Sequence, residues 1–237
     1  MLLHYFDQYL NNGGFPDWLN TQNKEILQLI YDDIVYRDII GRYGINEIKS
    51  FKQLSQFLST NIAKEFSYNS LAKSLNIKST TSVRNYVDYL QSAYLMYELY
   101  KYDYSLKKQF INQKKIYSID NGLRNNISFV HTSDSGRLLE NIVFIELKRR
   151  GENVFFYKGK NECDFLIHQS GKITTLLQVC YTINAVNETR ELSGLIEAAK
   201  IFNLNSGIII TYDQCDTFIK EGIEINIVAI WKWLLNI

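Results

Sequence analysis

The chain has 237 residues, of which 46% are hydrophobic and 22% are charged. This balance predicts a globular protein with a buried core and excludes a disordered or low-complexity chain. Lysine and arginine number 26 against 25 aspartates and glutamates, so the net charge of +1 excludes a polybasic tail but not a local basic patch.

The chain has three cysteines, which are odd in number and far apart: Cys163, Cys180 and Cys215. This pattern predicts neither a disulfide framework nor a CxxC zinc site, and it fits a reducing compartment. The N-terminal segment lacks the basic region and the cleavage site of a signal peptide. The longest apolar runs, such as residues 207–211, are too short to span a bilayer. We therefore expect a soluble, cytoplasmic protein.

Residues 1–66 are predicted to be helical, because apolar residues recur there at helical spacing. A first helix is expected to end at Gly13-Gly14, after which the chain restarts at Pro16. Two further amphipathic stretches follow, one that starts at Ile26 and ends near Gly41-Gly44 and one over residues 48–62.

The next part of the chain, residues 67–120, has the outline of a winged helix-turn-helix. Its expected elements are helices over 67–76 and 79–91, a strand over 95–104, a basic tip over 107–115 and a return strand over 116–119. This part holds eight lysines and arginines against four acidic residues, so it carries +4 while the remaining residues carry −3. The positive charge is therefore concentrated where nucleic acid would bind.

The helix that starts at Ser79 is predicted to be the recognition helix, and the lysines of the tip are predicted to contact phosphates. The residues assigned to nucleic-acid binding are Ser79, Thr80, Thr81, Arg84, Asn85, Lys107, Lys108, Lys114 and Lys115. The alternative is that the same outline serves only packing or protein contact.

Residues 121–237 mix helices with strands. The expected elements are helices over 138–150 and 188–202, strands over 154–157, 163–168, 173–180, 207–212 and 224–230, and a C-terminal helix. The order of one helix, three strands, a second helix and another strand predicts a sheet covered on both faces.

Three polar residues interrupt apolar runs in this part: Glu140 in a helix, and Asp164 and Gln178 in strands. A carboxylate is costly to bury unless it is paired, hydrogen-bonded or bound to a metal. Together these residues predict a polar pocket, which in an active form would hold a divalent metal for phosphodiester cleavage. The alternative is that Glu140 caps a neighbouring strand end or forms an ordinary ion pair with an arginine. The candidate arginines are Arg137, Arg149 and Arg190.

Several runs, taken in order, resemble the DUF4143 region that follows the ATPase domain of bacterial and archaeal AAA-type ATPases. The runs are residues 6–16, 33–38, 117–123, 139–141, 162–165 and 178–180. The resemblance implies that residues 1–66 are a helical linker after an absent ATPase domain, and that a winged helix-turn-helix over 67–120 follows. It implies that residues 121–237 are similar to PD-(D/E)XK nucleases, a restriction-endonuclease-like α/β sandwich with a mixed sheet.

The same resemblance assigns Glu140, Asp164, Gln178 and Cys180 to a nuclease-like pocket. The nuclease motif ends in a lysine, and Cys180 stands at that position, so the pocket is expected to be inactive. Lys158 and Lys160 are the candidate replacements for the lysine. The chain contains no G-x-x-x-x-G-K-[ST] phosphate loop, so we expect no ATP hydrolysis by this chain.

The leading hypothesis is a catalytically silent module that binds DNA and serves the upstream ATPase domain or another protein partner. No cofactor or metal is expected in this chain, ATP and Mg²⁺ belonging to the absent ATPase domain, and no membrane contact is expected. One alternative is a nuclease that uses Mg²⁺ or Mn²⁺. The other is a protein-interaction scaffold with Tyr100, Tyr102 and Tyr104 on one face of a strand. The oligomeric state stays open.

Overall fold

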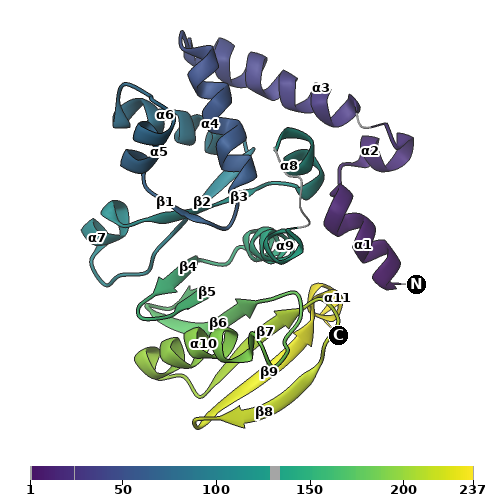
Figure 1. The fold of residues 1–237 in the computed structure, drawn as a ribbon, viewed down its shortest axis with the longest axis vertical. Coiled ribbons are helices and arrows are strands. Elements are labelled where there is room, and N and C mark those ends of the chain that lie inside the picture. The colour runs from purple at the N-terminus through teal and green to yellow at the C-terminus, as the bar shows by residue number, and fades with distance from the viewer. Residues whose placement is uncertain (1, 24, 129–133, 237) are drawn as a thin grey trace. The chain divides into compact units, whose positions relative to one another are not determined.

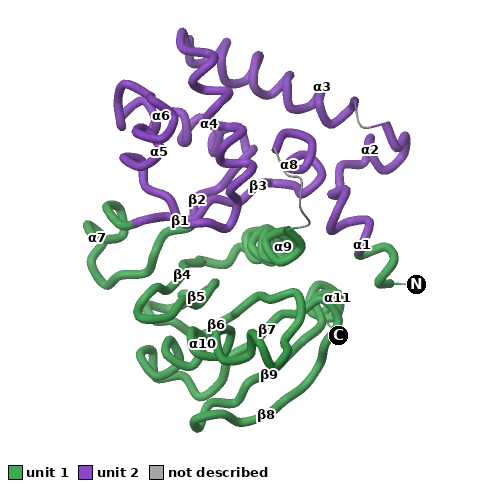
Figure 2. Tube along the Cα trace, viewed as in Figure 1, with its two compact units in different colours: residues 1–6, 99–112, 134–237 green, residues 7–98, 113–133 purple. Residues whose placement is uncertain are grey.

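The structure is a computed structural model that describes residues 2–23, 25–128 and 134–236 (Figure 1). Within these residues helices are mixed with two sheets, one of three strands and one of six, which confirms the expected α+β class. The chain folds into two compact units (Figure 2). Unit 1 comprises Met1–Phe6, Leu99–Asn112 and Asp134–Ile237, and unit 2 comprises Asp7–Glu98 and Gln113–Ser133. The two units therefore interleave in sequence, whereas the sequence predicted three consecutive parts.

Unit 2 consists mainly of helices. They are α1 (Leu2–Asn12), which begins in unit 1, α2 (Pro16–Thr21), α3 (Glu25–Asp33), the π-helix η1 (Ile34–Gly41), α4 (Ile48–Thr60), α5 (Tyr68–Ser74), α6 (Thr80–Ser92) and α8 (Asn121–Ile127). Phe51 and Leu54 of α4 share a buried core with Val83 and Val87 of α6. The helices α3, α4 and α6 are amphipathic, and burial of the apolar face of each against other elements stabilises it.

Side-chain caps define where the two central helices of unit 2 begin. The hydroxyl of Ser67 accepts a hydrogen bond of 3.1 Å from the N–H of Ser70, whose hydroxyl accepts one of 3.1 Å in return. Ser79, the predicted N-cap, accepts hydrogen bonds of 3.1 and 3.4 Å from the N–H groups of Thr81 and Ser82. The break between α5 and α6 therefore lies where the sequence placed it.

The small sheet has the strand order β1-β3-β2, with β1 (Glu65–Phe66), β2 (Met96–Tyr100) and β3 (Lys114–Ser118). The expected strand over 95–104 ends at Tyr100, and a short helix, α7 (Leu106–Ile111), follows it. The predicted two-stranded ribbon is thus shorter than expected, and its basic tip is partly helical.

Unit 1 contains the six-stranded sheet. Its elements are α9 (Ser135–Arg149), β4 (Val154–Lys158), β5 (Glu162–Gln169), β6 (Lys172–Val179), α10 (Glu188–Phe202), β7 (Ser206–Thr211), β8 (Asp216–Lys220), β9 (Ile223–Ala229) and α11 (Ile230–Leu235). The strand order is β4-β5-β6-β7-β9-β8. β4, β5 and β6 pair antiparallel, β6 and β9 each pair parallel to β7, and β8 closes one edge antiparallel to β9.

Two helices cover the opposite faces of this sheet. The ring of Phe144 in α9 lies 6.2 Å from the ring of Phe165 in β5. The next residue, Leu166, belongs to a buried cluster with Leu192 and Leu195 of α10. Since successive side chains of a strand point to opposite faces, α9 and α10 lie on different sides of the sheet, as the sequence predicted.

The elements that the sequence analysis did not predict include α8 and β8. The helix α8 has no continuous apolar face, and it starts at Asp120, whose carboxylate accepts a hydrogen bond of 2.9 Å from the N–H of Leu123. The strand β8 holds only two apolar residues and lies at the edge of the sheet. Both form through partners that are not visible in a local hydrophobic pattern.

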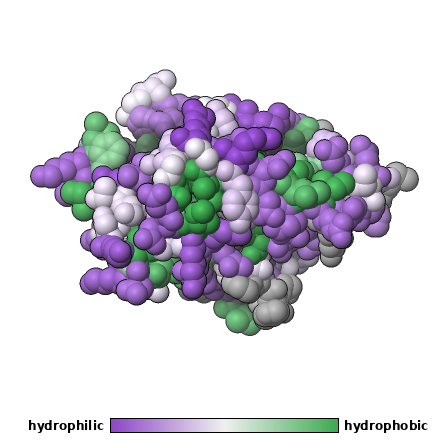
Figure 3. Space-filling view, turned by 90° about the horizontal axis from the view of Figure 1, so that it is seen from above, coloured by the Kyte–Doolittle hydropathy of each residue, from purple (hydrophilic) through white to green (hydrophobic). Residues whose placement is uncertain are grey.

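No helix in the described ranges combines the length and the apolar character needed to cross a membrane. On the face drawn in Figure 3, hydrophobic side chains form separate small areas among hydrophilic ones.

Candidate functional site

The polar residues that interrupt apolar runs in unit 1 come together around one pocket of about 410 Å³. Glu140 comes from α9, Asp164 from β5 and Gln178 from β6, and all three are buried. The other residues that line the pocket are Lys158, Asn161, Glu162, Val179, Arg190 and Glu191. The fold thus places on one site side chains that are up to 51 positions apart in the chain.

Two acidic groups of this pocket, those of Asp164 and Glu191, accept hydrogen bonds from the protein. The N–H of Val179 donates to Oδ2 of Asp164 at 3.0 Å, and the N–H of Asp164 donates to Oε1 of Gln178 at 3.3 Å. Nε2 of Gln178 donates to Oε2 of Glu191 at 3.0 Å, and Nε of Arg190 donates to the other oxygen of Glu191 at 3.0 Å. These donors offset the cost of removing the two carboxylates from water.

The pocket does not have the arrangement of a metal site. Mg²⁺ and Mn²⁺ require several oxygen ligands directed at one point. Across the residues that the structure describes, no group of three or more His, Cys, Asp or Glu side chains is placed to hold a metal ion. Asp164 and Glu191 instead face N–H donors. The residues of this pocket therefore do not fit a divalent metal ion.

Cys180, which follows β6, lies in the hydrophobic core of unit 1. Burial raises the pKa of its thiol to about 12, and the negative charges of Glu191 and Asp164 contribute to the shift. The thiol is therefore neutral near pH 7 and supplies no positive charge.

Of the two lysines considered as replacements, Lys158 lines the pocket and Lys160 is exposed. Nζ of Lys158 lies 2.6 Å from Oε2 of Glu162, so the ammonium is already paired within the pocket.

The sequence analysis missed Glu191, which is 4% exposed and lines the same pocket. The pattern that identified Glu140, a carboxylate on an apolar face of a helix, also holds for Glu191. Leu192 and Leu195 lie beside Glu191 in α10. The three arginines considered as partners of Glu140 each pair with another carboxylate. The observed pairs are Arg137–Asp134, Arg149–Glu146 and Arg190–Glu191.

The predicted recognition helix is α6 in unit 2, and it turns a polar face outward. Thr81, Arg84 and Asn85 are exposed, whereas Val83 and Val87 are buried. Three of the predicted residues have structural partners, and one of them is Arg84, whose guanidinium carbon lies 5.2 Å from the ring centre of Tyr68. Ser79 caps the helix, and Oγ1 of Thr80 donates to Oδ1 of Asn69 at 2.8 Å.

The prediction that four lysines lie at an exposed tip is wrong for two of them. Lys107 and Lys108 are exposed in α7, but Lys114 and Lys115 are 4% and 1% exposed in β3. The ammonium of Lys114 lies 4.9 Å from the ring centre of Tyr68. Burial lowers the pKa of Lys114, and the nearby negative charge of Glu98 opposes the shift. Lys114 therefore lies in the interior of unit 2 rather than at an exposed tip.

The three tyrosines considered for a scaffold do not share a strand face. β2 ends at Tyr100, and Tyr102 is half-buried with its ring centre 5.5 Å from Phe155 and 5.2 Å from Phe202. Tyr104 is 81% exposed. The stripe predicted from strand alternation is absent because the strand stops before it.

Comparison with known proteins places the chain in a different family from the one that the short runs suggested. A family model described as "Domain of unknown function (DUF8612)" matches residues 3–134. This match corrects the resemblance to the DUF4143 region of AAA-type ATPases, which rested on short separate runs.

Two curated relatives are described as uncharacterised proteins. One, from Methanocaldococcus jannaschii, is 38% identical over 256 aligned positions, which cover 99% of this chain and 56% of the relative. The other, from Haemophilus influenzae, is 30% identical over 237 positions, which cover 95% of this chain and 57% of the relative. The chain thus spans little more than half the length of these relatives. No solved structure matches the chain. Because the family model covers more than half of its residues, the chain belongs to the DUF8612 family.

Proposed function

We propose that this chain binds nucleic acid through the outward face of α6. The observation that carries the proposal is the exposed row of Thr81, Arg84 and Asn85 along the N-terminal half of the helix. A guanidinium and a carboxamide are the groups that read guanine and adenine edges in a major groove. Lys73 and Lys78, which precede α6 in the chain, are also exposed and are suited to phosphate contact.

The order of the elements around α6 supports a winged helix-turn-helix arrangement. α5 and α6 are joined by a tight link, and the strands β2 and β3 follow them in the chain. Because Lys114 and Lys115 are buried, no phosphate contact is assigned to them, and Lys107 and Lys108, exposed in α7 of unit 1, are not counted in the surface formed by α6. DNA is the expected partner.

We infer that unit 1 is a catalytically silent domain similar to PD-(D/E)XK nucleases. Its order of α9, three antiparallel strands, α10 and the parallel strand β7 supports this assignment. The proposed lack of catalytic activity is supported by the neutral thiol of Cys180 and by the hydrogen bonds that Asp164 and Glu191 accept within the protein.

Fluorescence anisotropy with labelled duplex DNA at a series of salt concentrations tests the proposal for α6. Arg84→Ala should weaken binding by about 5- to 150-fold if the guanidinium reads a base, since such a contact is worth about 1–3 kcal/mol. Lys73→Ala and Lys78→Ala should each reduce the slope of log K against log salt by about 0.9. Lys148→Ala, at an exposed lysine of α9, serves as the matched control and should leave binding unchanged. A binding affinity that changes neither with salt concentration nor with these substitutions would overturn the proposal.

A nicking assay on supercoiled DNA with Mg²⁺ or Mn²⁺ tests the inferred silence of unit 1. The full chain should leave the DNA intact. Nicking that persists through purification and disappears in Asp164→Asn would show an active nuclease and would refute the silent assignment.

A further inference from the structure

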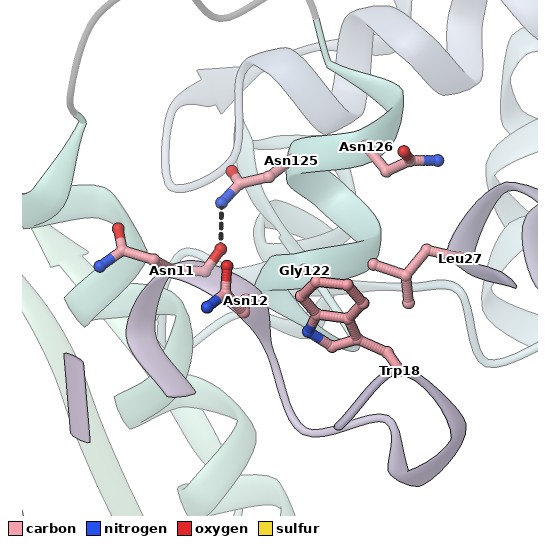
Figure 4. Close-up of a pocket in the computed structure, with 7 residues that line it drawn as sticks. All are labelled: Asn11, Asn12, Trp18, Leu27, Gly122, Asn125 and Asn126. Carbon is pink, nitrogen blue, oxygen red and sulfur yellow. Dashed lines mark hydrogen bonds between the residues drawn. The ribbon is translucent and has the colours of Figure 1, made fainter. Parts of the chain in front are cut away.

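A second pocket, of about 190 Å³, lies in unit 2 between the end of α1 and the helix α8 (Figure 4). The residues that line it include Asn12, Trp18, Leu27, Gly122, Asn125 and Asn126. Its volume is below the about 300 Å³ at which pockets for drug-sized ligands begin. The space suits one small ring system rather than a large cofactor.

Hydrogen bonds from α8 hold the wall of this pocket in place. Nδ2 of Asn125 donates to the carbonyl oxygen of Asn11 at 2.8 Å (Figure 4). Nδ2 of Asn121 donates to the carbonyl oxygen of Leu10 at 2.8 Å, and the N–H of Gly14 donates to Oδ2 of Asp120 at 2.7 Å. The segment that ends α1 is therefore fixed against the start of α8, and the pocket is formed without a ligand.

The closest approach within this wall is at Gly122. A Cβ atom there would lie 1.9 Å from the carbonyl oxygen of Asn12, a distance that no side chain tolerates. The glycine thus allows the two backbones to meet at the edge of the pocket.

The pocket contains a hydrogen-bond donor that the protein itself does not use. Trp18 is 5% exposed, and its Nε1 is one of two buried side-chain atoms, among the residues described, that have no hydrogen-bond partner. Figure 4 shows this nitrogen on the edge of the indole that faces Asn12. By contrast, Nε1 of Trp231 donates to Asp213 at 2.9 Å. A buried donor without a partner destabilises the folded protein, and a ligand with an acceptor atom would relieve that effect.

The chemistry of the lining defines the ligand. An acceptor is needed for the indole N–H, and the carboxamide of Asn12 offers both a donor and an acceptor. Leu27 and the Trp18 ring supply apolar walls, and the lining residues include no charged side chain. A neutral, flat group with donors and acceptors along its edge matches these features.

We propose that this pocket binds a single nucleobase. A phosphate or carboxylate would find no cation in the lining, whereas a base can stack its flat face on the indole ring. The base comes either from a free nucleoside or from a strand in which it is turned out of the stack. This inference does not depend on the role proposed for α6.

Titration by ¹H–¹⁵N NMR, observing the indole N–H signals of the full chain, tests the inference. The probes are adenosine, guanosine, cytidine and uridine, together with a short single strand and the same strand carrying an abasic site. The Trp18 signal, identified by its loss in Trp18→Phe, should shift in a saturable way. The Trp231 signal is the internal control and should stay in place, because its N–H is already bonded.

Substitutions separate the specific contact from general effects. Trp18→Phe keeps an aromatic ring but removes the donor, so binding should weaken by about tenfold. Asn12→Ala should weaken it by a similar factor, while Trp231→Phe should leave it unchanged. If Trp18→Phe does not fold, the inference is tested by the titration of the unaltered chain and by the loss of affinity in Asn12→Ala.

The outcomes are distinct. A shift with nucleosides assigns the site to a free base, and a shift with the intact strand but not with nucleosides or the abasic strand assigns it to a base within a strand. No shift of the Trp18 signal with any probe would overturn the inference, and so would equal affinity in Trp18→Phe. Salt-dependent DNA binding through Arg84 can succeed or fail independently of these results.

Discussion

Replacement of Asp164 by alanine should destabilise the protein. Oδ2 of Asp164 accepts the hydrogen bond from the N–H of Val179, and the side chain is 5% exposed. Alanine leaves this buried N–H without a partner, which costs about 1–3 kcal/mol. At an m-value of about 2 kcal/mol/M, a loss of about 2 kcal/mol lowers the urea midpoint by about 1 M. The measurement is equilibrium unfolding in urea at pH 7.

Two variants serve as controls for this experiment. Asp164→Asn retains an oxygen that accepts the Val179 N–H and should lose less stability than the alanine variant. Glu188→Ala removes an ion pair with Lys220 in which both side chains are 41% exposed, so its effect should stay below about 1 kcal/mol. Catalytic carboxylates are often destabilising in the folded state. An Asp164→Ala variant as stable as the unaltered chain, or more stable, would therefore refute the structural role that we assign to this residue.

Three further results are expected. Gly122→Ala should lower stability by more than about 1 kcal/mol, measured as a fall in the urea midpoint, because its Cβ would overlap the Asn12 carbonyl oxygen. Cys215, which is exposed, should react with iodoacetamide well before Cys180, whose buried thiol has a pKa of about 12; mass spectrometry of partly labelled protein checks the order. Burial alone would raise the pKa of Glu146, but hydrogen bonds from two arginines hold it below its usual 4.5, so its contribution to stability is present above that pH and is lost as the pH falls through the folded value. The stability difference between the unaltered chain and Glu146→Gln should therefore shrink in urea titrations run from pH 7 down to pH 3.

The sequence predicted the elements of unit 1 well where the signal was local. The helix expected over residues 188–202 is observed with those bounds, and the run at 207–212 forms β7 one residue earlier. Apolar periodicity and continuous apolar runs reflect burial directly, so such elements can be identified without a partner. α8 could not be found in this way, because it depends on the cap that Asp120 provides.

The polar pocket of unit 1 was predictable in part for the same reason. Glu140, Asp164 and Gln178 each interrupt an apolar run, and such a residue must meet a partner once it is buried. The lysine-rich tip was not predictable, because Lys114 is buried through Tyr68 and Glu98, which lie 46 and 16 positions earlier in the chain. A charge count along the chain says nothing about such distant partners.

The mistaken family resemblance also has a physical explanation. Two of its runs contact each other in unit 2, where Asp120 accepts the N–H of Gly14 and caps α8. Short turn and cap residues of this kind meet general requirements of the backbone. Such residues therefore recur in unrelated proteins and are a weak guide to the family of a chain.

The alternation of the two units along the chain has a practical consequence for deletion studies. The chain leaves unit 2 after Glu98, returns at Gln113 and leaves it again after Ser133. No single truncation point yields either unit intact, and a cut within residues 99–112 separates β2 from its neighbour β3. Loss of activity in a shortened protein would therefore not show that the deleted segment carries that activity. Point substitutions are better suited to distinguish the role of unit 1 from that of unit 2.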